Sequence, residues 1–202
     1  MRKILCTACA VLLSAACLCS LAACGDGSSG GGTDTEKPSF EKLVSEQLTE
    51  TEWNSAFLEE NFENVEYYGT SEEYSPVTVI CDGDTRMIEI ISGCMVLQEF
   101  VIRESDKYYT SNIYDGRNEA DIAAWEKWSV PMGICGWFWQ AADYSEAVWN
   151  DSENGYVITA EGKSVVVKFQ NKKLVAYYEM ASAGKERKWG MFSQYGTASW
   201  RR

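Results

Sequence analysis

The sequence contains no histidine in its 202 residues, and this absence removes much of the usual chemistry of enzyme sites. Histidine is the commonest general base near neutral pH, a member of Ser-His and Cys-His dyads, and the commonest transition-metal ligand. Positive charge is also scarce, because 18 Lys and Arg face 30 Asp and Glu, for a net charge of −12. An acidic chain is repelled by phosphate backbones. We therefore expect a protein that is not an enzyme, carries no metal or cofactor, and does not bind nucleic acid.

Cysteine is scarce outside the N-terminal segment. Of the eight cysteines, five precede residue 25, and Cys81, Cys94 and Cys135 follow. Their odd number and the absence of C-x-x-C spacing predict neither a disulfide scaffold nor a zinc site. We favour free, buried thiols. One disulfide bridge among the three cysteines is the open alternative.

The N-terminal segment has the pattern of a secretory signal. Arg2 and Lys3 supply a positive end, residues 4–23 are uncharged and mostly apolar, and small residues precede Cys24. The Leu-Ala-Ala-Cys motif at residues 21–24 resembles the lipobox of a bacterial type II lipoprotein signal, in which the residue matching Cys24 becomes the diacylglycerol-modified N-terminus. The alternative is an uncleaved anchor helix, because the apolar run is about long enough to span a bilayer. Both interpretations place the rest of the chain outside the cytoplasm.

A tether and a single folded domain are expected after this signal. Residues 25–33 consist of Gly, Ser, Thr and one Asp, a composition that stays a flexible coil because it has nothing to bury. We expect a signal peptide over residues 1–23, lipidated Cys24 and a tether over residues 24–37, and one domain over residues 38–202. The expected location is extracytoplasmic, at the cell membrane, with the lipid anchor as the contact to the membrane.

Periodicity in the domain alternates between strand and helix. Thr49 and Glu52 form a capping box that predicts a short helix ending near Asn61. Helices are also predicted over residues 119–128 and about 134–149, between two groups of strands. The predicted strands cover residues 65–70, 76–81, 85–91, 95–103 and 107–114, and then 156–160, 164–169, 173–182 and 188–195. Short strands with tight turns predict an antiparallel meander, and the two helices predict a cover for one face.

One face of the later strands is predicted to be a core face. Strand pairing about the tight turns brings their apolar residues to the same side of the sheet. These residues are Val157, Val165, Val167, Phe169, Leu174, Ala176 and Tyr178.

The lipobox, the tether, the interrupted meander and a short aromatic motif together resemble bacterial lipoproteins of the LolA/LppX-like type. The motif consists of Trp53, Ala56 and Phe57 leading into Asn61, Phe62, Asn64 and Val65. The resemblance implies an α+β fold, in which a strongly curved antiparallel β-sheet (a half-barrel meander) is covered on its concave face by short helices. It also implies a hollow between sheet and helices that holds lipid or the acyl chains of another lipoprotein. It supplies no invariant site residues.

Tryptophans in the helical insertion are candidates for the wall of such a hollow. Trp137, Trp139 and Trp149 are the residues that we expect to contact an apolar ligand, and Trp125 and Trp128 are further candidates for a groove. Aromatic stripes at helical spacing are also typical of a packed core, which is the competing interpretation.

Two carboxylates are the second candidate for a ligand contact. Glu89 and Glu99 are predicted to be diagonal neighbours on one face of a hairpin closed at residues 92–94. There they would form a polar handle in a binding hollow, or an acid and base pair. The alternative, which we favour, is that this face meets solvent.

Three short motifs are better explained as turns than as sites. Residues 150–161 resemble an EF-hand calcium loop, but Asn stands at its first position and a strand follows it. An Asn-Gly turn into a strand needs the same residues. The S-x-x-K at residues 182–185 and the Gly-Lys-Ser at residues 162–164 lack the remainder of the penicillin-binding and P-loop motifs.

Three functional hypotheses follow from the sequence. The first is a lipoprotein that binds a lipid or another apolar ligand or partner between sheet and helices, and the second is an envelope interaction or structural module with a filled core. The third is a hydrolase that uses two carboxylates. We favour the first.

Overall fold

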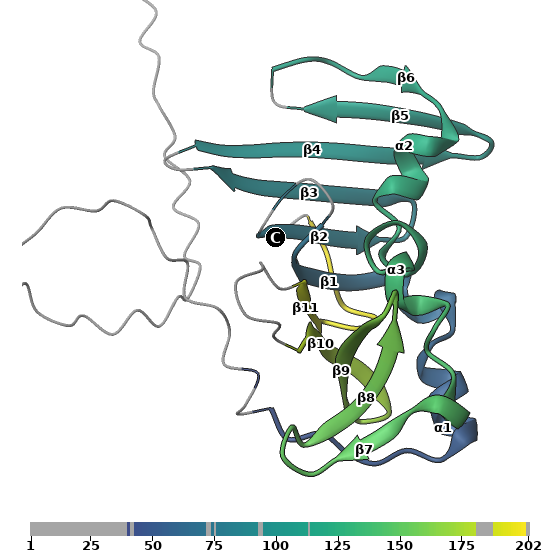
Figure 1. The fold of residues 1–202 in the computed structure, drawn as a ribbon. Coiled ribbons are helices and arrows are strands. Elements are labelled where there is room, and N and C mark those ends of the chain that lie inside the picture. Colours follow the sequence, from purple (N-terminus) through teal and green to yellow (C-terminus); the bar gives the residue numbers. More distant parts are fainter. Residues whose placement is uncertain are drawn as a thin grey trace, which may run out of the picture. The chain divides into compact units, whose positions relative to one another are not determined.

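An antiparallel sheet of eleven strands makes up most of the computed structural model of this chain (Figure 1). The structure describes residues 40, 43–71, 74, 76–92, 95–112, 114–180 and 188–200. The predicted signal and tether with Cys24, the thiol of Cys94 and the turn at residues 182–185 lie outside the described residues. Residues 35–202 form one unit, and the described part of it has a hydrophobic core made of its own residues.

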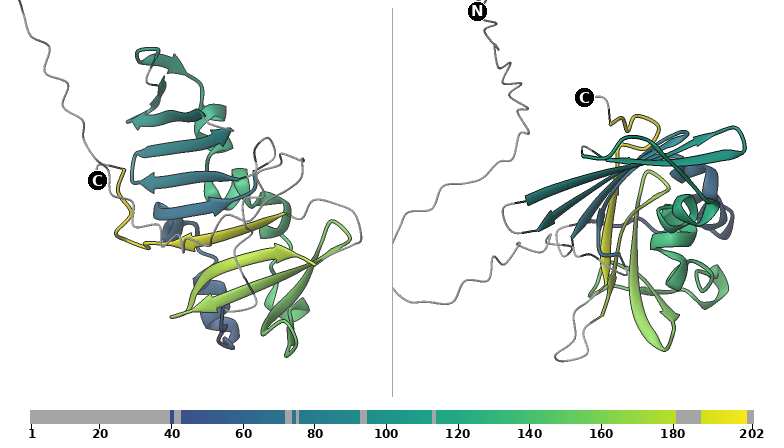
Figure 2. Two further views of the ribbon diagram at one scale, coloured as in Figure 1. Left: turned by 90° about the vertical axis from the view of Figure 1, so that its left-hand side faces the viewer. Right: turned by 90° about the horizontal axis from the view of Figure 1, so that it is seen from above.

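Two meanders build the sheet. The first runs through β1 (Asn64–Gly69), β2 (Val77–Asp82), β3 (Thr85–Ser92), β4 (Met95–Glu104), β5 (Lys107–Asn112) and β6 (Asn118–Ala120). The second runs through β7 (Val148–Asn150), β8 (Gly155–Ala160), β9 (Lys163–Gln170), β10 (Lys173–Glu179) and β11 (Trp189–Ser193). Within each meander every strand pairs with the next one, and β1 pairs with β11, so that β6 and β7 form the edges (Figure 2). The antiparallel meander predicted from the sequence is confirmed.

Short helices precede β1 and separate the two meanders. They are α1 (Glu50–Ala56), η2 (Glu59–Phe62), α2 (Ile122–Lys127), η3 (Val130–Ile134), α3 (Gly136–Trp139) and η4 (Tyr144–Glu146). No helix in the described ranges is both long and apolar enough to cross a membrane.

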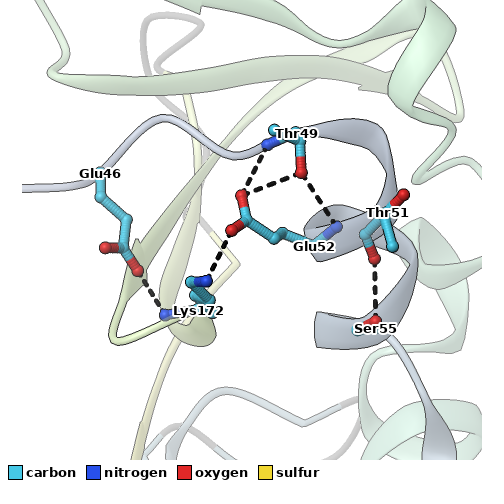
Figure 3. A network of polar contacts seen from close by, with 6 residues as sticks. All are labelled: Glu46, Thr49, Thr51, Glu52, Ser55 and Lys172. Atoms are coloured by element: carbon cyan, nitrogen blue, oxygen red, sulfur yellow. Dashed lines mark hydrogen bonds and ion pairs between the residues drawn. The ribbon is translucent and has the colours of Figure 1, made fainter.

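The first helix begins where the capping box predicts. The Glu52 amide donates to the Thr49 hydroxyl at 3.4 Å, and the Thr49 amide donates to the Glu52 carboxylate at 2.9 Å (Figure 3). The same carboxylate forms an ion pair with Lys172 at 2.7 Å, which ties α1 to the turn between β9 and β10 (Figure 3). The helix ends at Ala56, earlier than predicted, and a 3-10 turn, η2, completes the segment.

The helices of the insertion are shorter than predicted. The Asp121 carboxylate accepts the Ala124 amide at 3.2 Å and starts α2 there, which leaves residues 118–120 to pair as β6. The single helix predicted over about residues 134–149 is wrong. The Asp143 carboxylate accepts the Ser145 amide at 2.8 Å and begins a separate 3-10 turn, and Trp149 lies in edge strand β7.

The main core lies between one face of the sheet and these helices. It contains β-strand residues such as Tyr67, Val79 and Val167 together with Trp53, Trp125 and Phe138 from α1, α2 and α3. The opposite face carries a smaller cluster of Val166, Tyr178 and Trp189, against which Phe40 packs.

The predicted core face of the later strands is wrong for three of its seven residues. Val157 pairs with Val166, and a β-bulge between Leu174 and Ala176 brings Ala176 opposite Lys168 and Tyr178 opposite Val166. Because one extra residue moves every later side chain to the other face, Ala176 and Tyr178 lie with Val157 on the face of the smaller cluster.

Candidate functional site

The three tryptophans predicted to contact a ligand are partly buried and pack against the main core. Trp137 lies edge-on to Phe138 and Tyr177, with ring centroids 5.2 and 6.0 Å away. Trp139 lies edge-on to Phe57 and Phe62, each at 4.9 Å. Trp149 lies edge-on to Tyr156 at 5.2 Å, and its indole donates to the Asp151 carboxylate at 2.8 Å. None of the three lines the clefts described below.

The two glutamates predicted to share a face lie on opposite faces of the sheet. Glu89 pairs with Gln98, whose amide donates to the Glu89 carboxylate at 2.8 Å, whereas Glu99 pairs with Ile88. The prediction assumed a turn over residues 92–94, but the ladder continues to the pair of Ser92 and Met95. This difference of one residue separates the carboxylates and removes the acid and base pair.

A cleft of about 740 Å³ lies beside α2 instead. Its apolar wall consists of Tyr108, Ile122, Ala123, Trp125, Met132 and Gly133. Polar groups of Glu59, Glu126, Lys127 and Ser129 complete it. This volume and mixture of apolar wall and few polar groups are typical of a pocket for a small ligand.

Local sequence explains how this cleft is shaped. The Asp121 cap begins α2 directly after β6, and α2 contacts β4 and β5. Pro131 lies in the first turn of η3, where its missing amide hydrogen costs nothing. A Cβ at Gly133 would lie 2.3 Å from the carbonyl oxygens of Glu126 and Lys127, so only glycine lets η3 approach the end of α2 this closely.

A smaller pocket of about 140 Å³ shares Glu59, Trp125 and Ser129 with this cleft. Arg86 and Arg103 line it, with their guanidinium carbons 4.0 and 4.9 Å from the centroid of the Trp125 ring. Both cations therefore contact the aromatic side chain that also forms part of the apolar wall.

The two arginines differ in their surroundings. Arg103 is half-exposed and forms an ion pair with Asp84 at 2.7 Å. Arg86 is 6% exposed, and burial lowers the pKa of its guanidinium, an effect that the nearby Cys81 thiol opposes. A buried cation beside an apolar cleft is therefore the main electrostatic feature of this part of the molecule.

The described thiols are inert groups of the core. Cys81 and Cys135 are free and fully buried. Burial raises the pKa of Cys81 to about 11 and that of Cys135 well above its usual range. Neither thiol is therefore ionised near neutral pH, and neither has the character of a nucleophile.

Acidic residues do not gather into a metal site in the described ranges, where no group of three or more Cys, Asp or Glu could hold an ion. In the loop that resembles a calcium site, Asn150 accepts the Glu153 amide at 3.1 Å and Asp151 accepts the Trp149 indole. The Glu153 carboxylate accepts the Tyr178 hydroxyl at 2.7 Å. These oxygens stabilise the turn between β7 and β8.

No protein-family model matches this sequence, and no curated protein matches it significantly.

The cleft was only partly visible in the sequence. Trp125 was a candidate because it lies in a predicted helix of aromatic and apolar residues. Arg86 carried no signal, since an arginine that alternates with apolar residues in a strand is expected to face solvent. The tertiary structure buries it, where the Trp125 ring of α2 packs against its guanidinium group.

Proposed function

We propose that this protein is a lipid-anchored extracytoplasmic lipoprotein that binds an apolar ligand in the cleft beside α2. In this proposal the sheet is a strongly curved half-barrel, and the short helices cover its concave face. The membrane is contacted through the lipid on Cys24.

The apolar wall of the cleft is the observation that carries this proposal. Trp125 is 8% exposed, and together with Ile122 and Met132 it lines a cleft of about 740 Å³. Ile122 and Met132 are 50% and 45% exposed, so the cleft has apolar surface for a ligand to cover. An apolar ligand would remove this surface from water and gain roughly 25 cal/mol for each Å² buried.

The proposed lipid anchor is supported by the lipobox-like sequence around Cys24. Its test is fatty-acid labelling. The full chain and its Cys24→Ala variant are expressed in a bacterium with a lipoprotein pathway and labelled with an alkyne fatty acid. We expect the fatty-acid label in the parent and no label in the variant. An unlabelled parent would contradict lipidation, and a labelled variant would move it to another residue.

The ligand is tested by mass spectrometry of lipids that copurify with the full chain. We expect an apolar species that is depleted in Trp125→Ala, which opens the wall of the cleft, and retained in Trp149→Phe, which keeps a ring far from it. Absence of any such species in the parent, together with no binding of added fatty acid, would contradict the proposal.

An envelope interaction module without a ligand is the second candidate. It is favoured by the packing of Trp137, Trp139 and Trp149, which are partly buried against the main core and do not line the cleft. In that case the exposed apolar residues of the cleft would be covered by a partner protein, and no lipid would copurify.

A further inference from the structure

The pocket that adjoins the cleft contains a buried cation, Arg86, that has no ion-pair partner within 4 Å among the described residues, although the Glu63 and Asp84 carboxylates act on it from farther away. Arg86 donates from Nη1 to the carbonyl oxygens of Gly83 and Thr85, at 2.7 and 3.3 Å. Its Nε is buried and has no hydrogen-bond acceptor within the described residues. It forms no ion pair with any residue that the structure describes, whereas Arg103 is already paired with Asp84.

This arrangement is costly unless an anion completes it. A buried guanidinium loses hydration, and a donor that is left unsatisfied costs on the order of 1–3 kcal/mol. Neutral carbonyl groups offset only part of this cost. A carboxylate or phosphate would offset more, because hydrogen bonds between ionised groups are roughly twice as strong as neutral ones.

We infer that the pocket at Arg86 receives the anionic headgroup of an amphiphile whose apolar chain lies in the cleft beside α2. This inference rests on the proposed function and adds the chemical class of the ligand. The two spaces share Glu59, Trp125 and Ser129, so they adjoin there, as the inference requires. A pocket of about 140 Å³ has room for a small headgroup such as a carboxylate or a phosphate.

The carboxylates in the same pocket do not reverse this preference. Glu59 and Glu63 line it but are exposed, so their charges are hydrated and screened, whereas Arg86 is 6% exposed. The interaction of an anion with the buried cation is therefore expected to be stronger than its repulsion by the exposed acids. The chain as a whole is acidic, so general charge attraction does not favour anions.

The experiment compares amphiphiles that have the same alkyl chain and different headgroups. The unit of residues 35–202 is titrated calorimetrically with dodecanoate, dodecanol and dodecyltrimethylammonium, each below its micellar concentration. We expect dodecanoate to bind at least about tenfold more tightly than dodecanol, equivalent to about 1.4 kcal/mol, and the cation to bind most weakly. A further titration with dodecyl phosphate distinguishes the two anionic headgroups.

Variants then assign the preference to Arg86. In Arg86→Gln we expect dodecanoate and dodecanol to bind within about twofold of each other, with the affinity for dodecanol retained. Arg117→Gln is the matched control, because it removes the same charge at an exposed ion pair with Glu104 outside both pockets, and it should keep the preference. Arg86→Lys retains the positive charge and is used if the glutamine variant does not fold; it should still prefer dodecanoate over dodecanol.

The outcomes separate the two proposals. Equal binding of dodecanoate and dodecanol by the parent, or an unchanged preference in folded Arg86→Gln, overturns the anionic class and leaves an apolar ligand in place. Absence of binding by every amphiphile overturns the proposed function itself.

Discussion

One buried polar residue in this protein, Lys168, has its partners in a chain segment from outside the sheet. Lys168 is fully buried on the face of the smaller cluster, and its Nζ donates to the carbonyl oxygens of Phe40 and Leu43 at 2.9 and 3.1 Å. The segment before α1 is therefore held to the sheet by a charge-assisted contact as well as by packing of Phe40 on Tyr178.

Replacing this ammonium group tests the contact at the residue scale. Lys168→Met keeps the aliphatic stem but leaves both carbonyl oxygens without this donor, so the free energy of unfolding should fall by about 1–3 kcal/mol. Urea denaturation of residues 35–202 measures the change. Lys107→Met, at an exposed position in β5, should change it by less than about 0.5 kcal/mol.

At the scale of elements, side-chain caps mark where three of the described short helices begin. Thr49, Asp121 and Asp143 each accept a backbone amide at the first turn of α1, α2 and η4. These helices are too short to be stable alone, so the caps and the core contacts of their apolar residues hold them together. The strands, in contrast, are held by pairing over their full length.

The cap of α1 predicts a pH dependence of stability. The contact with Lys172, and then the hydrogen bonds from Thr49, lower the pKa of Glu52 from 4.5 to about 2. Because the carboxylate is favoured in the folded state, its contribution is present above pH 4.5 and is lost as the pH falls to about 2. Glu52→Gln should unfold more easily than the parent at neutral pH, and this difference should shrink over that interval.

The role of the cap itself is measured at neutral pH. Thr49→Ala removes the hydroxyl that accepts the Glu52 amide and should lower the free energy of unfolding by about 1 kcal/mol. Thr51→Ala changes an exposed neighbour that does not cap the helix and serves as the control. Equal effects of the two substitutions would show that the cap is not the source of stability.

At the scale of the whole domain, the two meanders are joined only through β1 and β11 among the described strands. Gly69 and Gly190 lie opposite each other in this pair. A Cβ at Gly190 would meet the rings of Tyr67 and Tyr177, and a Cβ at Gly69 would meet the Tyr67 hydroxyl and the Trp189 carbonyl oxygen. The two hydroxyls are hydrogen-bonded at 2.9 Å, and burial raises both pKa values well above the usual range. This joint is made by residues that are far apart in the sequence.

An added methyl group at this joint should destabilise the whole domain. A Cβ at Gly190 would lie 2.5 Å from ring atoms of Tyr67 and Tyr177, so Gly190→Ala should lower the free energy of unfolding by about 1–3 kcal/mol. Gly116→Ala, where a Cβ would meet no atom within 4 Å, is the matched control. A cooperative shift of the whole urea transition is expected for Gly190→Ala, whereas loss of one meander alone would show that the halves fold independently.

Local patterns in the sequence by themselves determined the positions of nine strands, the start of α1 and the antiparallel class of the sheet, because alternation, turn residues and caps act over a few neighbouring residues. The bulge after Leu174, the register of β3 with β4, and the pairing of β1 with β11 were decided only by the tertiary structure. A one-residue shift in strand register leaves the alternation of apolar and polar residues intact but moves side chains to the other face of the sheet. Such shifts place Glu89 and Glu99 on opposite faces and Tyr178 on the face of the smaller cluster. The cleft beside α2 likewise depends on a helix that covers Arg86 from a distant part of the chain, a contact that no local pattern records.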